Sequence, residues 1–395
     1  MNEFNYIAKN IKHPGVYLSE SIQENGFSVA EFAARVVKPT KTIYAIIKGE
    51  SSITPEMAKS VSNVLGTKPE FWINMQKGFD LENAENIIEG NIDKALKEKW
   101  IQEFHPKTYS DLLNHNLVKK TKIPKERVRS FFNYFAINSS RSLLKIYSKH
   151  IEASRFRSKN VDNKSKILAL VSFVRYGEIA SKRLIVDNFN KDVLESNLSL
   201  IKEILWKKEE GFKEQLVELL AECGIKLIFS PKFTGLDVIG SFTYIGENPV
   251  IQITDKGKRY DRFCFTLAHE IGHCKLHGKN FNSIDFDTNS INLDRDYEKK
   301  EFEANNFARK FLLSPGLEVG KVDGKYFSEL NSLFDPESTN YMKFPSFCVK
   351  YKVHETNIIG AWLHENPEAY KSDYDLVNKV TSTFRLEEKD YILNQ

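Results

Sequence analysis

Two histidines and a glutamate in one short stretch have the types and spacing to perform metal-dependent hydrolysis. His269 and His273 are four residues apart, and Glu270 follows the first of them. On a helix, side chains at this spacing lie one above the other, close enough to hold one metal ion. A catalytic zinc ion takes three protein ligands and keeps one position open for water. Glu270 would face that water as a general base and then donate the proton to a leaving amine.

The third ligand is expected from a second helix, at about residues 298–313. Glu301, Ala304 and Ala308 share one face of this helix, so it can approach the first helix closely and present a carboxylate. Glu301 is the predicted third ligand, and Glu303 is the alternate. Two imidazoles and one carboxylate leave the coordination unfilled, which favours a catalytic zinc ion over a structural one. The alternatives are a metal-free surface motif and a purely structural zinc ion.

Two residues next to the motif, His277 and Cys274, each allow more than one interpretation. His277 lies four residues beyond His273 on the same stripe. There it would either orient a ligand or face an oxyanion, or else pack against or cap the helix end. Cys274 is adjacent to His273 and has a chance of influencing the site. The four cysteines form no C-x-x-C pair, so we predict buried, reduced thiols instead of a zinc knuckle or redox site.

The elements that must position these residues can be read from the surrounding pattern. Residues 225–229 read as a strand, and residues 241–245 and 250–254 as a hairpin. A helix is then expected at about 261–277, capped by Asp261. The hairpin before this helix would supply the sheet edge that holds an extended substrate. Since the rest of the chain reads as helices, the fold class is mostly α with a small β-sheet (α+β).

The sequence around the motif resembles the ImmA/IrrE family of metallopeptidases over about residues 215–317. The stretches that carry the resemblance are Phe265-Thr266-Leu267-Ala268-His269-Glu270-Ile271-Gly272-His273 with Leu276-His277-Gly278, Glu301-x-x-Ala304-Asn305-x-Phe307-Ala308, and Phe311-Leu312-Leu313-Ser314-Pro315. The resemblance implies a zincin-like domain of gluzincin type, with zinc held by His269, His273 and Glu301 and with Glu270 as the catalyst. It also implies a role, since family members cleave a repressor and so release gene expression. Ser314 departs from the methionine that is common before the proline, with no expected chemical consequence.

The first 80 residues are expected to form short helices. Ser28 followed by Glu31 is a capping-box signal, and Thr54-Pro55-Glu56 opens another helix in the order N-cap, N1, N2. Residues 13–76 resemble the XRE-type helix-turn-helix of HigA antitoxins. The matching stretches are Ala30-Glu31-Phe32-Ala33, Ile46-Ile47-Lys48-Gly49, Ile53-Thr54-Pro55-Glu56-Met57-Ala58 and Leu65-Gly66-Thr67-Lys68-Pro69-Glu70-Phe71-Trp72. The resemblance implies five short helices and homodimers on palindromic operators.

The recognition helix is expected at about residues 39–48. A recognition helix reads the major groove with its outward, N-terminal side chains. Ile43 and Ile46 would hold this helix on the core. The predicted contacts are to bases from Thr40, Lys41, Thr42 and Tyr44, and to phosphate from Lys38 and Lys48.

Charge is spread unevenly along the chain. Residues 12–80 hold 8 basic and 7 acidic side chains, which is thin for a DNA binder. Residues 91–190 hold 21 basic and 9 acidic ones, an excess that invites a polyanion. This segment would supply phosphate contacts that the head lacks. One alternative is that these basic side chains only lie on helix faces exposed to solvent. Another is that the head binds a protein partner, such as a toxin, and not DNA.

Length and composition suggest a cytoplasmic protein of several domains. The 395 residues are 41% hydrophobic and 28% charged, the balance of a globular protein, with no apolar run of membrane-spanning length and no signal-peptide pattern. Four segments are predicted: a helix-turn-helix head at 1–88, a basic helical connector at 89–200, the metallopeptidase domain at 201–330 and a C-terminal closing segment at 331–395.

Two functional hypotheses follow. In the first, the chain is a DNA-binding regulator whose zinc endopeptidase domain cleaves a protein partner of repressor or antitoxin type. In the second, it is a HigA-like antitoxin and transcription repressor that binds a toxin and operator DNA, with the zincin fold as a non-proteolytic scaffold. The complete ligand set favours the first hypothesis, and the HigA-like head favours the second.

Overall fold

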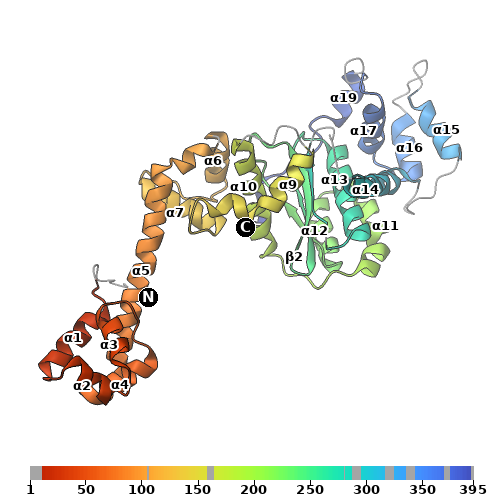
Figure 1. The fold of residues 1–395 in the computed structure, drawn as a ribbon. Helices are drawn as coiled ribbons and strands as arrows, with labels where there is room; N and C mark the ends of the chain where they lie inside the picture. Colours follow the sequence, from red (N-terminus) through yellow and green to blue (C-terminus); the bar gives the residue numbers. More distant parts are fainter. Residues whose placement is uncertain are drawn as a thin grey trace. The chain divides into compact units, whose positions relative to one another are not determined.

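A computed structural model describes residues 11–104, 106–157, 164–279, 281–286, 295–315, 324–334, 343–368 and 374–392. The chain divides into two compact units, Met1–Glu98 and Lys99–Gln395. It is mostly helical, with one four-stranded sheet in the second unit, so the predicted α+β class is confirmed (Figure 1). Within the described ranges, no helix is both long and apolar enough to cross a bilayer.

The first unit is a bundle of five helices around one core. They are α1 (Pro14–Glu24), α2 (Val29–Arg35), α3 (Thr40–Ile47), α4 (Pro55–Leu65) and α5 (Pro69–Lys97). Ser28 caps α2 as expected, because its Oγ accepts from the backbone N–H of Glu31 at 3.1 Å. The reciprocal half of the capping box is replaced, since Glu31 pairs with Arg35 at 2.8 Å. Thr54 caps α4 by accepting from the N–H of Met57 at 3.2 Å.

The core of this unit is closed by a tight approach of α1 to α3. A Cβ atom at Gly15 would lie 2.7 Å from the backbone carbonyl carbon of Ile46, so only glycine allows the two helices to meet here. Around this contact Leu18, Phe32 and Trp72 are fully buried. The helix-turn-helix pair α2 and α3 therefore rests on a packed support.

The fifth helix is much longer than the sequence led us to expect. We predicted five short helices, but α5 runs for 29 residues. Its N-terminal part is anchored in the core by Trp72 and Gln76, whereas Leu81 and Ile87 are exposed. Gly78 and Gly90 lie within the helix and do not end it, because an isolated glycine costs a helix only about 1 kcal/mol.

The second unit begins with a helical layer. Its elements are η1 (Trp100–Glu103), α6 (Pro106–Asn114), α7 (Pro124–Phe135), α8 (Ser142–Ile146), α9 (Ser148–Arg157), α10 (Lys164–Ser181), α11 (Lys191–Lys207) and α12 (Phe212–Glu222). The break expected at residues 138–140 separates α7 from α8, and the one expected at 158–163 lies outside the described residues. Trp100, Phe131 and Phe132 form an aromatic cluster that holds the first of these helices together.

The sheet contains β1 (Lys226–Phe229), β2 (Val238–Ile245), β3 (Asn248–Ile253) and β4 (Ser283–Phe286) in the order β1-β3-β2-β4. β2 and β3 form the predicted hairpin, β1 is parallel to β3, and β4 is antiparallel to β2. The pairing of β2 with β4 shifts register between Val238 and Gly240. α12 packs against β1, and α13 (Tyr260–Leu276) packs against β2 and β3 (Figure 1).

α13 is the central helix of this unit. Its N-cap is Arg259, so Asp261 stands in the first turn instead of capping the helix as predicted. α14 (Arg295–Leu313) packs along it, and a Cβ atom at Gly272 would lie 3.3 Å from the Cα of Ala304. The small residues thus allow the close helix approach that the sequence predicted.

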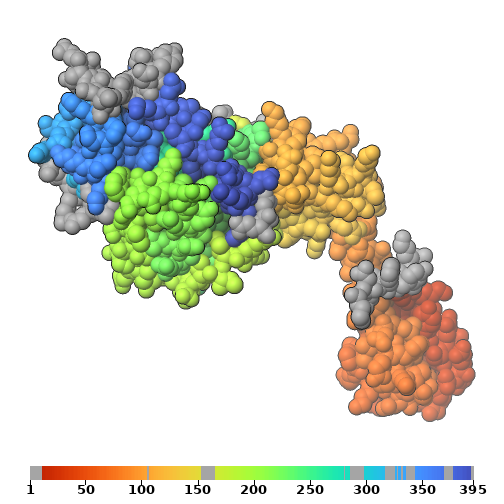
Figure 2. Space-filling model, turned by 180° about the vertical axis from the view of Figure 1, so that it is seen from behind, coloured from red at the N-terminus to blue at the C-terminus, as the bar shows by residue number. Residues whose placement is uncertain are grey.

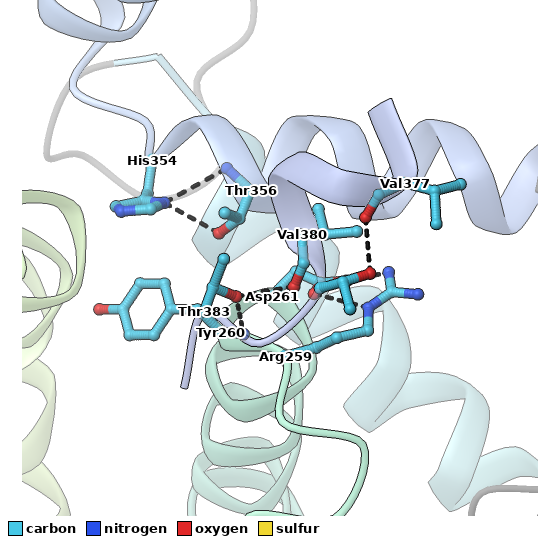
Figure 3. A network of polar contacts seen from close by, with 9 residues as sticks. Arg259, Tyr260, Asp261, His354, Thr356, Val377, Val380 and Thr383 are labelled. Atoms are coloured by element: carbon cyan, nitrogen blue, oxygen red, sulfur yellow. Dashed lines mark hydrogen bonds and ion pairs between the residues drawn. The ribbon is translucent and has the colours of Figure 1, made fainter. Parts of the chain in front are cut away.

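The C-terminal helices follow α14, and one of them, α17, packs against α13. They are α15 (Gly324–Ser332), α16 (Phe344–Tyr351), α17 (Glu355–Glu365), α19 (Tyr374–Val380) and η3 (Glu388–Asp390). A Cβ atom at Gly360 would lie 2.7 Å from the Cγ of Asp261, so a glycine on α17 makes room for this side chain of α13. Within the second unit, the segment after α19 (blue in Figure 2) lies at the end of α11, where Nζ of Lys208 donates to the carbonyl of Thr383 at 2.9 Å. Figure 3 shows that Oγ1 of the same threonine accepts from the N–H of Tyr260, at 2.9 Å, where α13 begins. All four cysteines are buried and reduced, as predicted.

A buried lysine ties α11 to the end of α14. Lys202 is 2% exposed, and its Nζ donates to the carbonyl of Ser314 at 2.7 Å. Burial lowers the pKa of Lys202 to about 8, against about 10.4 for a free lysine. Because the folded state binds this proton less tightly than the unfolded state, the resulting destabilisation is complete below pH 8 and is relieved as the pH rises towards 10.4.

We therefore expect the stability of the wild-type chain to increase relative to that of a Lys202→Met variant between pH 8 and pH 10. The difference in melting temperature, followed by scanning fluorimetry, should grow by at least about 2 °C. Lys191→Met, which removes an exposed lysine at the start of the same helix, is the control and should show no such trend. A flat difference for Lys202→Met would contradict the depressed pKa.

Candidate functional site

Two imidazoles converge on one face of α13. The Nε2 atoms of His269 and His273 lie 2.8 Å apart, and these residues are 2% and 0% exposed. The ligand-type atoms of His269, Glu270 and His273 all lie within 4.8 Å of one another, and we call these three residues the His–Glu–His cluster. The ring of His269 stacks on Phe265, and that of His273 stacks on Phe242 and contacts Phe281, so aromatic rings flank both imidazoles.

The carboxylate of Glu301 on α14 completes the candidate ligand set. Its Oε2 lies 3.2 Å from Nε2 of His269, and its Oε1 lies 3.4 Å from Nε2 of His273. A tetrahedron with zinc–ligand distances of about 2.0–2.1 Å has edges of about 3.3 Å. The three side chains therefore fit a single zinc ion. Glu303, the alternate in the sequence prediction, pairs with His277 instead of the two metal-site histidines.

Side chains behind the imidazoles fix their orientation. Nδ1 of His269 lies 2.9 Å from Oδ1 of Asn305, and Nδ1 of His273 lies 2.8 Å from Nδ1 of His277. His277 in turn places its Nε2 3.1 Å from Oε2 of Glu303. Supporting contacts of this kind set the tautomer and ring orientation of metal-binding histidines. The structure thus brings His277 and Glu303 together beside the site, and it adds Asn305, which sequence reasoning missed.

Glu270 is held between the helix and the sheet. It is completely buried, and its Oε2 accepts from Oγ of Ser283 on β4 at 2.8 Å. Gly240, at the register shift of β2, makes room for Thr266 on α13, because a Cβ atom there would clash with the Thr266 side chain. Burial and the charge of Glu270 raise the pKa of the neighbouring Cys274 thiol well above its usual range, so the thiol stays protonated.

The predicted recognition helix is α3, at the surface of the first unit. Ile43 and Ile46 face the core as predicted, while Lys41, Tyr44 and Lys48 are exposed. The remaining candidates, Lys38, Thr40 and Thr42, are half-buried. Nζ of Lys38 is 2.6 Å from Oε1 of Glu56, so a phosphate would have to compete with this ion pair.

The basic segment of residues 91–190 falls mostly in the second unit. Its exposed basic side chains lie on several helices and the turns between them: Lys94, Lys97, Lys99, Lys107, Lys119, Lys120, Lys122, Lys125, Arg141, Lys145, Lys149, Lys182 and Arg183. The sequence-level excess of positive charge is therefore accessible to a polyanion.

Family models match both parts of the chain. Residues 221–315 match the IrrE N-terminal-like domain, which belongs to a metallopeptidase-like, zinc-associated family. This range contains α13 and α14, and with them Glu301 and every residue of the His–Glu–His cluster. Residues 18–72 match the helix-turn-helix model, a range that includes α2 and α3.

Known proteins similar to this chain match about a fifth of its length. The HTH-type transcriptional regulator YddM of Escherichia coli (strain K12) is 34% identical over 80 residues, which are 20% of this chain and 85% of that protein. Virulence-associated protein A′ of Dichelobacter nodosus is 30% identical over 77 residues, which are 19% of this chain and 67% of that protein. A solved addiction module antidote protein of the HigA family from Coxiella burnetii is 32% identical, with 22% of this chain and 95% of that chain covered and a TM-score of 0.20. The chain thus belongs to the XRE-type helix-turn-helix transcriptional regulators, and it carries an IrrE N-terminal-like domain at residues 221–315, C-terminal to this head.

Proposed function

We propose that the chain is a cytoplasmic transcription regulator whose zinc-dependent endopeptidase domain cleaves a protein partner of repressor or antitoxin type. The observation that carries this proposal is the convergence of His269, His273 and Glu301 at distances that suit one zinc ion, with Glu270 buried beside them. A structural zinc site would be closed by a fourth protein ligand, whereas two imidazoles and one carboxylate leave a position for substrate.

The roles of the chain's own residues follow from this geometry. A bound zinc ion would supply a Lewis acid that polarises the peptide carbonyl and activates water. Glu270 accepts the proton of the attacking water and passes it to the leaving amine. Ser283 donates to Oε2 of this carboxylate at 2.8 Å and so fixes its orientation. Asn305 and His277 keep the two imidazoles in the orientation in which both Nε2 atoms face Glu301.

The test is a comparison of two bacterial strains that produce the wild-type chain or its Glu270→Gln variant. Because an amide cannot accept the water's proton, we expect new protein N-termini in the wild-type strain only, confined to one or a few proteins. Proteome-wide mapping of N-termini measures this directly. Identical N-termini in both strains would rule out proteolysis and favour the second candidate function. In that function the chain is a HigA-like antitoxin that binds a toxin, and the zincin fold is a scaffold; the resemblance of the head to HigA antitoxins supports it.

We propose further that the head binds operator DNA, as a homodimer on a palindromic site. This rests on the helix-turn-helix assignment of residues 18–72 and on the exposure of Lys41, Tyr44 and Lys48 along α3. Since the head is almost neutral, the basic residues of segment 91–190 would add the phosphate contacts from which non-specific affinity arises.

The contribution of the basic segment can be measured in the full-length chain. A Lys120→Glu/Lys122→Glu variant should bind a 40-base-pair duplex of random sequence more weakly than the wild type. Its plot of log affinity against log salt should be shallower by about 0.9 for each phosphate that the variant no longer neutralises. The charge-matched control is Lys232→Glu/Lys310→Glu, which reverses two exposed lysines outside the segment. Equal slopes for the two variants would assign the basic segment to a protein partner or to solvent.

Substitutions on the recognition helix α3 should change sequence preference instead of salt dependence. Lys41→Ala and Tyr44→Ala should alter the sequences selected from a randomised duplex pool while leaving the salt slope nearly unchanged, because base contacts specify and phosphate contacts position. If both variants select the same sequences as the wild type, these side chains do not contact bases, and the head would be an adaptor for a protein partner.

A further inference from the structure

A lysine-rich turn leads from α6 into α7 within the second unit. Residues 118–125, which we call the lysine turn, contain four lysines and no acidic residue. All four lysines are exposed: Lys119, Lys120, Lys122 and Lys125. Lys119 lies 3.5 Å from Glu126, but both side chains are exposed, so this ion pair is weak. Within the described ranges, Lys120 and Lys122 pair with no carboxylate. The turn therefore presents a positive charge that the chain itself does not neutralise.

An exposed apolar pair lies among these lysines. Ile123 is 54% exposed, and Pro124, which follows it, is exposed as well. A single exposed aliphatic side chain is common on a protein surface. Here, however, the isoleucine is joined to an exposed proline, and Lys122 and Lys125 flank the pair. Isoleucine and proline are among the side chains that proteins insert between neighbouring base pairs of DNA.

Hydrogen bonds on both sides of Ile123 hold the lysine turn in shape. Its N–H donates to Oγ1 of Thr121 at 3.1 Å, and its carbonyl accepts from the N–H of Arg127 at 3.1 Å. The guanidinium of Arg127 also donates to the carbonyl of Thr121 at 3.0 Å. Val118, at the start of the turn, is buried. Because the turn is already ordered, little conformational freedom is lost when it binds a partner.

Duplex DNA is the partner that fits this combination of charge and apolar surface. Unneutralised lysines attract a polyanion, and each phosphate that they contact releases counterions. Phosphate contacts alone give no role to the apolar pair, whereas the minor groove accepts an apolar wedge between two base pairs. The same chain carries a helix-turn-helix head at residues 18–72. DNA is therefore favoured over other polyanions.

We propose that the lysine turn binds the minor groove of DNA without sequence specificity and inserts Ile123 and Pro124 between two base pairs. Lys119, Lys120 and Lys122 contact the phosphates beside the wedge. Such a wedge unstacks the base step and kinks the duplex by about 20–90° towards the major groove. Flexible pyrimidine–purine steps are the easiest to kink, so they should be preferred. This inference rests on the proposed binding of DNA by the chain.

Bending is measured by the ligase-catalysed circularisation of a DNA fragment of about 100 base pairs, which is shorter than the persistence length and closes poorly unless a protein bends it. The full-length wild type should raise the yield of circles. At equal occupancy of the DNA, Ile123→Ser should lower this yield about tenfold, because the wedge supplies the kink. The matched control is Ile185→Ser, which changes a 96% exposed isoleucine of the same basic segment outside the lysine turn. It should give the wild-type yield.

The salt dependence of affinity for the same fragment distinguishes the wedge from the phosphate contacts. Ile123→Ser should bind more weakly than the wild type with an unchanged salt slope, because an apolar side chain releases no counterions. Lys120→Glu/Lys122→Glu should lower both the salt slope and the yield of circles.

The outcomes separate the wedge from the proposed DNA binding. Equal yields of circles for the wild type and Ile123→Ser, or an equal loss with Ile185→Ser, overturn the wedge. Binding of the fragment by the wild type without any gain in circles also overturns it and leaves DNA binding intact. No binding at any salt concentration refutes DNA binding and the wedge with it. Sedimentation with phosphatidylserine vesicles that Ile123→Ser abolishes, without a gain in circles, overturns the wedge and assigns the lysine turn to a membrane surface.

Discussion

Replacing both His269 and Glu301 by alanine is expected to reduce the zinc content from about one ion per chain to less than about a tenth of that. In the wild type the two Nε2 atoms are 2.8 Å apart, and they lie 3.2 and 3.4 Å from Oε2 and Oε1 of Glu301, respectively. The double variant leaves a single imidazole, which cannot hold the ion through dialysis against a weak chelator. Elemental analysis of the purified chain gives the result directly.

The matched control for zinc content is Glu270→Gln, which changes a residue of the same cluster that does not ligate in our assignment. It should keep its zinc and its circular dichroism spectrum while losing proteolysis. Asn305→Ala should lie between the two, with zinc affinity lower by about 10–100-fold, because it removes the support of His269 without removing a donor. Full zinc content in the double variant would show that the ligand assignment is wrong.

The second large effect is expected in the head. Gly15→Val should destabilise the first unit by about 3 kcal/mol, the upper end for overpacking, because the added side chain meets the backbone of Ile46 instead of a flexible side chain. Since each 1.4 kcal/mol is tenfold in an equilibrium, amide protection in α1 and α3 should fall by about 100-fold. Hydrogen exchange followed by mass spectrometry on the full-length chain measures the two helices separately from the second unit.

Gly90→Val is the control for this prediction. Gly90 also lies in a helix, but a Cβ atom there would have no atom within 4 Å. Its replacement should leave the protection of α1 and α3 unchanged. Comparable losses in both variants would mean that the close approach of α1 and α3 is not what holds the head together.

The chemistry of the site was readable from the sequence because helix geometry fixes it locally. The spacing of His269 and His273 alone places both imidazoles on one face. Glu301 was predictable because Ala304 and Ala308 mark the face of α14 that meets α13. Ser283 was not predictable, since it reaches Glu270 from β4, a four-residue strand whose residues pair with β2 residues 41 or more positions earlier in the chain and that has no marked alternation. Such a contact depends on tertiary pairing, which local patterns do not encode.

Boundaries and supporting contacts were less accessible than the motifs. Asp261 looked like an N-cap, but its carboxylate binds Arg259 and meets Gly360 of α17, a partner almost 100 residues away. Glu31 looked like half of a capping box, but the (i, i+4) pair with Arg35 uses its carboxylate instead. In both cases the residue type was right for the predicted cap, and a competing partner in the folded chain determined the outcome. The length of α5 was missed because it contains two glycines and little apolar periodicity.

The length of α5 has a consequence for anyone who wishes to transplant the head onto another enzyme. A cut at residue 88, the predicted end of the head, would stop α5 in mid-course and strip its last four carbonyls of their intrahelical partners. α5 ends naturally at Glu98, which caps the helix because its backbone N–H donates to the carbonyls of Leu96 and Lys94. A graft that ends at residue 98 would therefore contain the whole of α5 with its C-terminal cap, whereas the last turn of the helix would fray in the shorter graft.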